Sequence, residues 1–142
     1  MAVGNFTFYN QGKARVADID LDAATVAWVL LTDSYTPAAT HDDWTDISAT
    51  ECADGDYSEQ SVAVTVSESA GTVTLGVSGS EVSFGTSVTI TAKYLVAVIG
   101  TAGSLTGTDK LIGYADLSSG GGSVSSASST FKVTYASGFA TY

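Results

Sequence analysis

The sequence predicts an all-β fold, a β-sandwich of about eight strands with an immunoglobulin-like or jelly-roll outline, and three observations indicate it. Residues 26–31 form an apolar run with no polar face, which is typical of a strand buried on both sides. Residues 61–77 alternate apolar and polar side chains with the two-residue period of a strand. Short runs of this kind recur along the chain between Gly- and Ser-rich turns.

The composition favours one domain with its own core. The chain has 142 residues, of which 44% are hydrophobic and only 14% are charged. A chain of this length buries roughly two-thirds of its unfolded surface, so residues 1–142 are predicted to form a single domain. Cys52 is the only cysteine and has no intramolecular disulfide partner, so we expect a buried thiol.

The charge balance bears on the partners of the protein. Five basic residues stand against fifteen acidic ones, which gives a net charge of -10. Binding to nucleic acid depends on Lys and Arg displacing counterions, so we expect no nucleic-acid partner. The longest apolar runs have six residues, whereas a membrane-spanning helix needs roughly 20. The N-terminus also lacks the basic region of a secretory signal, so we expect no membrane partner and production in the cytoplasm.

The first third of the chain divides into three parts around residues 26–31. The aromatic-rich residues 1–12 are predicted to be either an edge strand or an arm that docks elsewhere. Residues 18–22 alternate Asp with Ile or Leu, which predicts an extended segment with its carboxylates on one face. Residues 32–60 show no clear period, and a bare loop of that length is uncommon, so a short helix is expected at 42–47.

The rest of the chain shows regular strand patterns. Residues 61–77 predict a hairpin that turns at 69–71. The apolar end of residues 86–99, from residue 94 on, predicts a strand that pairs with 26–31 in a sheet covered on both faces. Further strands are predicted at 81–84, 110–117 and 130–135, with a Gly/Ser-rich loop at 118–129.

No residue pattern points to catalysis. His41 is the only histidine, and neither Cys52 nor the nearby carboxylates stand at a recognisable zinc spacing from it. The Gly-x-Ser-x-Gly turn that would present a nucleophilic serine is absent from the sequence. We therefore expect a non-enzymatic protein with no catalytic residues, no metal ligands and no cofactor.

Two further motifs suggest a ligand but also have plainer interpretations. Residues 18–22 begin like a calcium loop, but Ala23 and Val29 stand where that loop needs Gly and Glu. Weak calcium binding at 18–22, 42–46 or 54–56 stays open beside the interpretation as solvated acidic edges. Trp44, next to Asp42 and Asp43, either stacks on a sugar ring or fastens the long loop to the sandwich.

The order of several segments resembles a family of small virion proteins of tailed bacteriophages. The segments are F-T-F-Y-N, I-D-L-D, V-A-W-V-L-L-T-D-S-Y-T-P, H-D-D-W-T-D-I-S-A-T-E, T-I-T-A-K-Y-L-V-A-V-I and L-I-G-Y-A-D-L. This resemblance covers most of the chain. One departure is Lys-Ala-Arg at 13–15, where family members often have a longer helix-like segment after the N-terminal strand.

The resemblance implies a capsid decoration, or cement, protein that binds the outer surface of the phage head. Its partner would be the major capsid protein, and its location the virion after assembly in the host cytoplasm. Such proteins are typically all-β and often multimeric. A homotrimer is expected by analogy, because it fits the threefold sites of an icosahedral shell.

The candidate partner-binding residues are Phe6, Phe8, Tyr9, Lys13 and Arg15. On the arm interpretation, the aromatic side chains would anchor the segment, its backbone would add to an open sheet edge, and the two basic residues would meet acids of the shell. The competing interpretation is that Phe6 and Phe8 belong to the core of the domain's own first strand.

A second function from another class is a tail or baseplate component, or a receptor- or glycan-binding module of the virion. On this hypothesis Trp44 and Tyr57 would form an exposed platform together with Asp42, Asp43 and Asp46.

Overall fold

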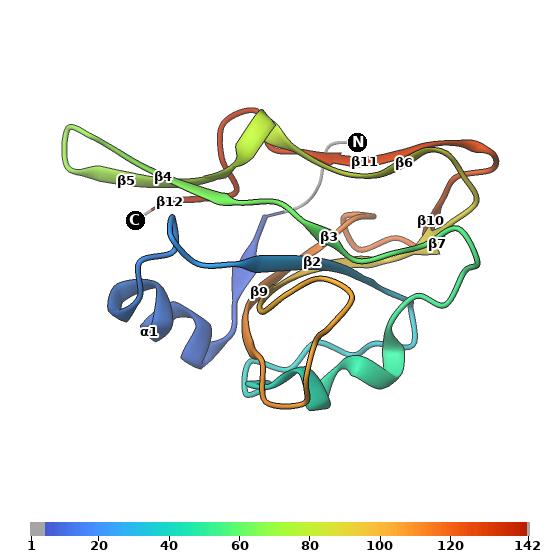
Figure 1. Cartoon of the computed structure of the whole chain (residues 1–142), viewed down its shortest axis with the longest axis horizontal. Coiled ribbons are helices and arrows are strands. Elements are labelled where there is room, and N and C mark those ends of the chain that lie inside the picture. The colour runs from blue at the N-terminus through green and yellow to red at the C-terminus, as the bar shows by residue number, and fades with distance from the viewer. Residues whose placement is uncertain (1–4, 142) are drawn as a thin grey trace.

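The computed structural model describes residues 5–141 and confirms the all-β class (Figure 1). In this range seven strands have six residues or more, and five short strands have two. The strands are β1 (Thr7–Phe8), β2 (Val26–Leu31), β3 (Gln60–Ser61), β4 (Val64–Ser69), β5 (Thr72–Val77), β6 (Glu81–Val88), β7 (Thr91–Ala92), β8 (Tyr94–Ile99), β9 (Lys110–Asp116), β10 (Val124–Ser125), β11 (Ser129–Thr134) and β12 (Ala140–Thr141). The helical elements are α1 (Asn10–Asp18) and the 3₁₀ turns η1 (Trp44–Asp46), η2 (Ser48–Thr50) and η3 (Ser78–Ser80).

A five-stranded antiparallel sheet forms the centre of the molecule, in the order β1-β9-β8-β2-β3. Strands β2 and β8 pair along their whole length, from Val26 opposite Ile99 to Leu31 opposite Tyr94. The sequence prediction that these two apolar strands are neighbours is therefore confirmed.

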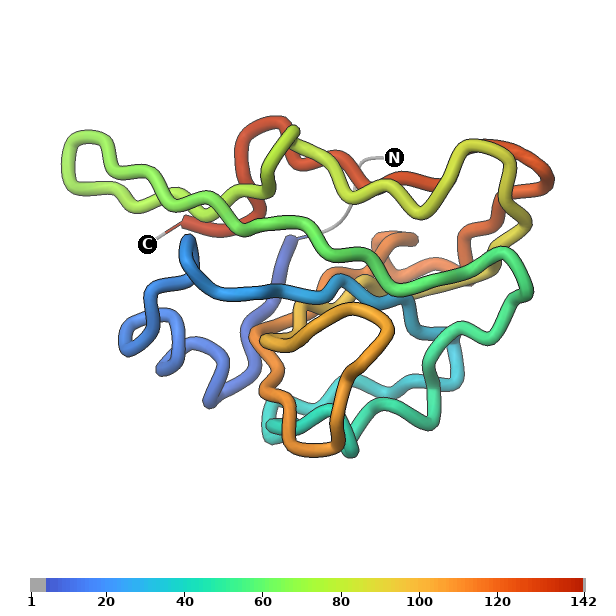
Figure 2. The backbone as a smooth tube through the Cα atoms, viewed as in Figure 1, coloured from blue at the N-terminus to red at the C-terminus, as the bar shows by residue number. Residues whose placement is uncertain are grey.

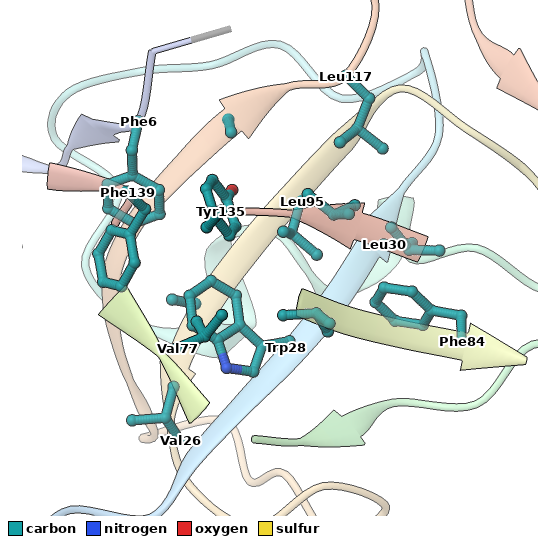
Figure 3. Close-up of a cluster of buried hydrophobic side chains, with 14 of the residues drawn as sticks. Phe6, Val26, Trp28, Leu30, Val77, Phe84, Leu95, Leu117, Tyr135 and Phe139 are labelled. Carbon is teal, nitrogen blue, oxygen red and sulfur yellow. The ribbon is translucent and has the colours of Figure 1, made fainter. Parts of the chain in front are cut away.

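A second layer lies over one face of this sheet, as the tube in Figure 2 shows. It contains the three strands β12-β5-β4 and the pair β11-β6. Trp28, Leu30, Phe84 and Phe139 belong to the hydrophobic core between the layers (Figure 3). The Trp28 indole N–H donates a 2.9 Å hydrogen bond to the Val62 carbonyl, so this large side chain is buried without an unsatisfied donor.

The opposite face of the central sheet carries a core of its own. Val29 and Leu31 of β2 pack there with Tyr35, Trp44 and Ile47, which come from the long connection after β2. That connection forms two 3₁₀ turns, where the sequence predicted one short helix. Since both faces are covered, all six residues of β2 are buried, as the missing polar face predicted.

The N-terminal third differs from the sequence prediction. Residues 10–18 form α1, and the extended segment predicted at 18–22 is wrong, because Asp18 ends the helix and residues 21–23 form turns. The helix packs against β9 through Gly12, where an added Cβ would overlap the Ile112 carbonyl oxygen. The missing side chain thus permits a contact between the helix and the strand backbone.

None of the helices within residues 5–141 has the length and apolar character needed to cross a membrane.

Candidate functional site

Two of the five predicted partner-binding residues are part of the domain's core. Tyr9 is completely buried, and its hydroxyl lies 2.7 Å from that of Tyr35. Phe6 is also buried, and its ring centroid lies 4.7 Å from that of Phe139. Strand β1 between them pairs with β9, so these two side chains fix an edge strand within the domain.

The other three predicted residues lie nearer the surface. Phe8 is half-buried and Lys13 is exposed, and both line a depression of about 450 Å³ beside Asn5 and the C-terminal strand β12. Arg15 is turned away from that depression, because its guanidinium donates a 3.0 Å hydrogen bond to the Leu111 carbonyl and pairs with Asp42. The structure thus brings Phe8 and Lys13 together and separates them from Arg15.

An ion cluster joins α1, the long connection and β9. Asp42 accepts from Arg15 and lies 3.3 Å from the Lys110 ammonium, which also pairs with Asp43. The hydrogen bond from Arg15, together with that from Lys110, holds the pKa of the Asp42 carboxyl below its usual range. Asp46 accepts from the backbone N–H of Asp42 at 2.8 Å, which fixes the connection on which these acids lie. The cluster fastens three elements that the sequence separates.

A chain of hydrogen bonds runs through the second core from Tyr9 to Tyr35 and on to Nδ1 of His41, at 2.7 and 3.0 Å. Burial raises the pKa of Tyr9, and it raises the pKa of Tyr35 to about 12. Both phenols are therefore neutral at pH 7 and satisfy each other's polar groups. His41 is half-buried and holds the outer end of this chain.

The exposed Trp44–Tyr57 platform predicted for a glycan-binding module is not formed. Trp44 is only 7% exposed and belongs to the second core, so it fastens the long connection to the sheet. The Tyr57 hydroxyl donates to Glu51 at 2.9 Å and accepts from the Leu30 backbone N–H at 3.1 Å. Both rings are used inside the domain, which was the plainer of the two interpretations of Trp44.

Two aspartates of the acidic loop before β3 accept hydrogen bonds from the backbone near β7. Asp54 accepts a 2.6 Å hydrogen bond from the Thr91 N–H, and Asp56 accepts one of 2.8 Å from Thr89. Cys52, buried as expected, also donates to Asp54. Within residues 5–141, no three His, Cys, Asp or Glu side chains are grouped closely enough to hold a metal ion.

One surface feature was missed by the sequence reasoning. The β4–β5 hairpin extends past the central sheet at the α1 end of the molecule (Figures 1 and 2). Between it and the segment after α1 lies a cavity of about 270 Å³, the hairpin groove. Its lining residues are Val16, Ile19, Asp20, Leu21, Asp22, Val66, Val73 and Leu75. The alternation in residues 61–77 predicted the apolar face of this hairpin. It did not predict that part of this face would lie beyond the edge of the central sheet.

No protein-family model, curated protein or solved structure matches this chain.

Proposed function

We propose that this chain is a structural, non-enzymatic protein of a tailed-bacteriophage virion, a decoration protein that binds the outer head lattice. It would join neighbouring subunits of the major capsid protein and stabilise the shell, as a homotrimer at threefold sites. The resemblance of its segments to small virion proteins supports the family, and the construction of the domain supports an adhesive role.

The observation that carries the proposal is a central sheet covered on both faces combined with a projecting hairpin. Strands β2 and β8 are covered on both faces, and every residue of β2 is buried. On the β4 side of the hairpin, all residues from Thr65 to Ser69 are exposed.

A preformed surface of this kind loses little conformational entropy on binding. Many copies on one lattice also gain avidity, so weak single contacts are enough to stabilise a shell.

The proposal is tested by counting copies. Quantitative mass spectrometry of purified virions would measure the ratio of this chain to the major capsid protein, and hundreds of copies per particle are expected. A count of a few to some dozens would contradict the head location and favour the tail, baseplate or receptor-binding alternative. Absence from the particle would contradict both.

Adding the purified protein to heads that lack it supplies the functional test. We expect it to bind the heads and to raise the temperature at which they release their DNA. Heads that stay undecorated at saturating protein would contradict a cementing role.

A further inference from the structure

Within residues 5–141, the hairpin groove combines an exposed apolar surface with a strand edge that pairs with no other strand. Val66 pairs across the hairpin with Leu75, and Glu68 pairs with Val73, so these four side chains lie on the same face. That face looks toward the segment that follows α1. Val66 is 42% exposed and is the exposed large hydrophobic residue of the described chain.

The charged residues that line the groove or lie on its hairpin face are all acidic. Asp20 and Asp22 line it, and Glu68 lies on the hairpin face above it. None of the described lining residues is Lys or Arg. Because this chain has a net charge of -10, a second copy would on the whole be repelled from the groove. A basic partner would instead be attracted to its carboxylates.

The edge of β4 that is unpaired within residues 5–141 shows on which side of the hairpin a partner strand could add. In the described chain β4 pairs only with β5, at one end of its sheet. Ser69 and Thr72 flank the two-residue turn, so Ser69 and every second residue before it direct their backbone groups toward β5. The backbone groups of Val66 and Glu68 therefore point away from β5, to where an added strand would lie.

We propose that the hairpin groove binds an extended segment of the capsid partner, which adds to β4 as a strand. An aliphatic side chain of that segment packs on Val66, and a Lys or Arg two residues away faces Glu68, Asp20 and Asp22. The two-residue spacing follows because only alternate side chains of an added strand lie on the groove face. That the partner is a capsid protein rests on the proposed function. That its segment carries an aliphatic and a basic side chain is inferred from the residues of the groove.

Binding of purified variants to heads lacking the protein tests this surface. Val66→Asp places a charge in the groove, and Ser67→Asp places the same charge on the outer face of the same strand. We expect Val66→Asp to weaken binding by about tenfold or more, as for a central interface residue, and Ser67→Asp to bind like wild type. Near-UV circular dichroism checks that both variants are folded.

The charge component has its own pair of variants. Asp22→Asn is expected to weaken binding several-fold, and the exposed Asp33→Asn to leave it unchanged. Raising the salt from about 0.05 M to about 0.5 M should reduce the difference between Asp22→Asn and wild type, because the Debye length shortens severalfold. Equal binding of Val66→Asp and wild type would overturn the groove proposal, although the decoration function would stand. A wild-type protein that binds no heads contradicts the function itself.

A photo-crosslinking amino acid at position 66 identifies the occupant on decorated heads. The expected product is a capsid-protein peptide with Lys or Arg two residues from an aliphatic residue. Crosslinks between two copies of this chain, or to a capsid segment without a basic residue, would overturn the proposal.

Discussion

Gly12 is the residue at which a single added carbon is expected to cost most. Ala normally stabilises a helix relative to Gly by about 1 kcal/mol. Here the added Cβ would overlap the Ile112 carbonyl oxygen, and this atom belongs to the backbone rather than to a flexible side chain. We expect Gly12→Ala to lower the free energy of unfolding by about 2 kcal/mol or more. Urea denaturation measures it, with the exposed Ala14→Ser as control, and an increase in stability would contradict the observed contact.

Tyr135 is expected to show the opposite behaviour. Its hydroxyl is buried and has no hydrogen-bond partner within residues 5–141, and burial raises its pKa. Because an unsatisfied buried hydroxyl costs about 1–3 kcal/mol, Tyr135→Phe should leave stability unchanged or raise it by about 1 kcal/mol. Tyr57→Phe is the matched control, since it removes two hydrogen bonds and should destabilise by about 1–2 kcal/mol. Thermal denaturation of both variants decides, and equal losses would be inconsistent with the difference in hydrogen bonding.

At the scale of the element, the β4–β5 turn can be improved. Ala70 and Gly71 both have positive φ, 52° and 83°, as a two-residue type I′ turn requires. Asn tolerates this conformation better than Ala, so Ala70→Asn should stabilise the domain by about 0.5–1 kcal/mol. Gly71→Ala, which introduces strain without any steric contact, should destabilise by about 1 kcal/mol. Denaturation midpoints that shift in the same direction for both variants would rule out this turn type.

The ion cluster should make the packing of α1 on β9 sensitive to acid. The folded-state pKa of Asp42 lies below its ordinary value of 3.8. The carboxylate therefore contributes stability above about pH 4, and this contribution is lost as the pH falls through the folded-state value. Asp42→Asn should thus be less stable than wild type at pH 6, and the difference should shrink towards pH 3. Denaturation curves across this range test it, with the exposed Asp33→Asn as control, and a difference independent of pH would contradict the ionic contribution.

For the molecule as a whole, the sequence predicted the strands better than the helix. The apolar run of β2 and the apolar end of β8 have no polar face, so a sheet covered on both faces was the one arrangement that could bury them. Helix α1 has only a weak sequence pattern, because its one buried residue is Gly12. Glycine adds no apolar side chain to a helix face, and its helix propensity is lower than that of any residue except proline. The position of the helix depends on the contact with Ile112, which lies 100 residues further along the chain.

The candidate site was less predictable than the fold. Aromatic side chains near a terminus suit both a core and an interface, and only the tertiary contacts of Tyr9 with Tyr35 and of Phe6 with Phe139 distinguish the two. Arg15 was expected to meet acids of a partner but pairs with Asp42 of its own chain. Val66 is exposed because the hairpin extends beyond the central sheet. The relative lengths of these two layers cannot be predicted from a local sequence pattern.

The two tryptophans lie on opposite faces of the central sheet, Trp28 in the core between the layers and Trp44 in the core under the long connection. Each indole is therefore a natural optical reporter for one half of the interior. Replacing either one by Phe leaves a protein whose emission follows a single compartment during denaturation. Within each single-tryptophan protein, an emission curve that coincides with the far-UV circular dichroism curve would mean that both compartments unfold as one cooperative unit.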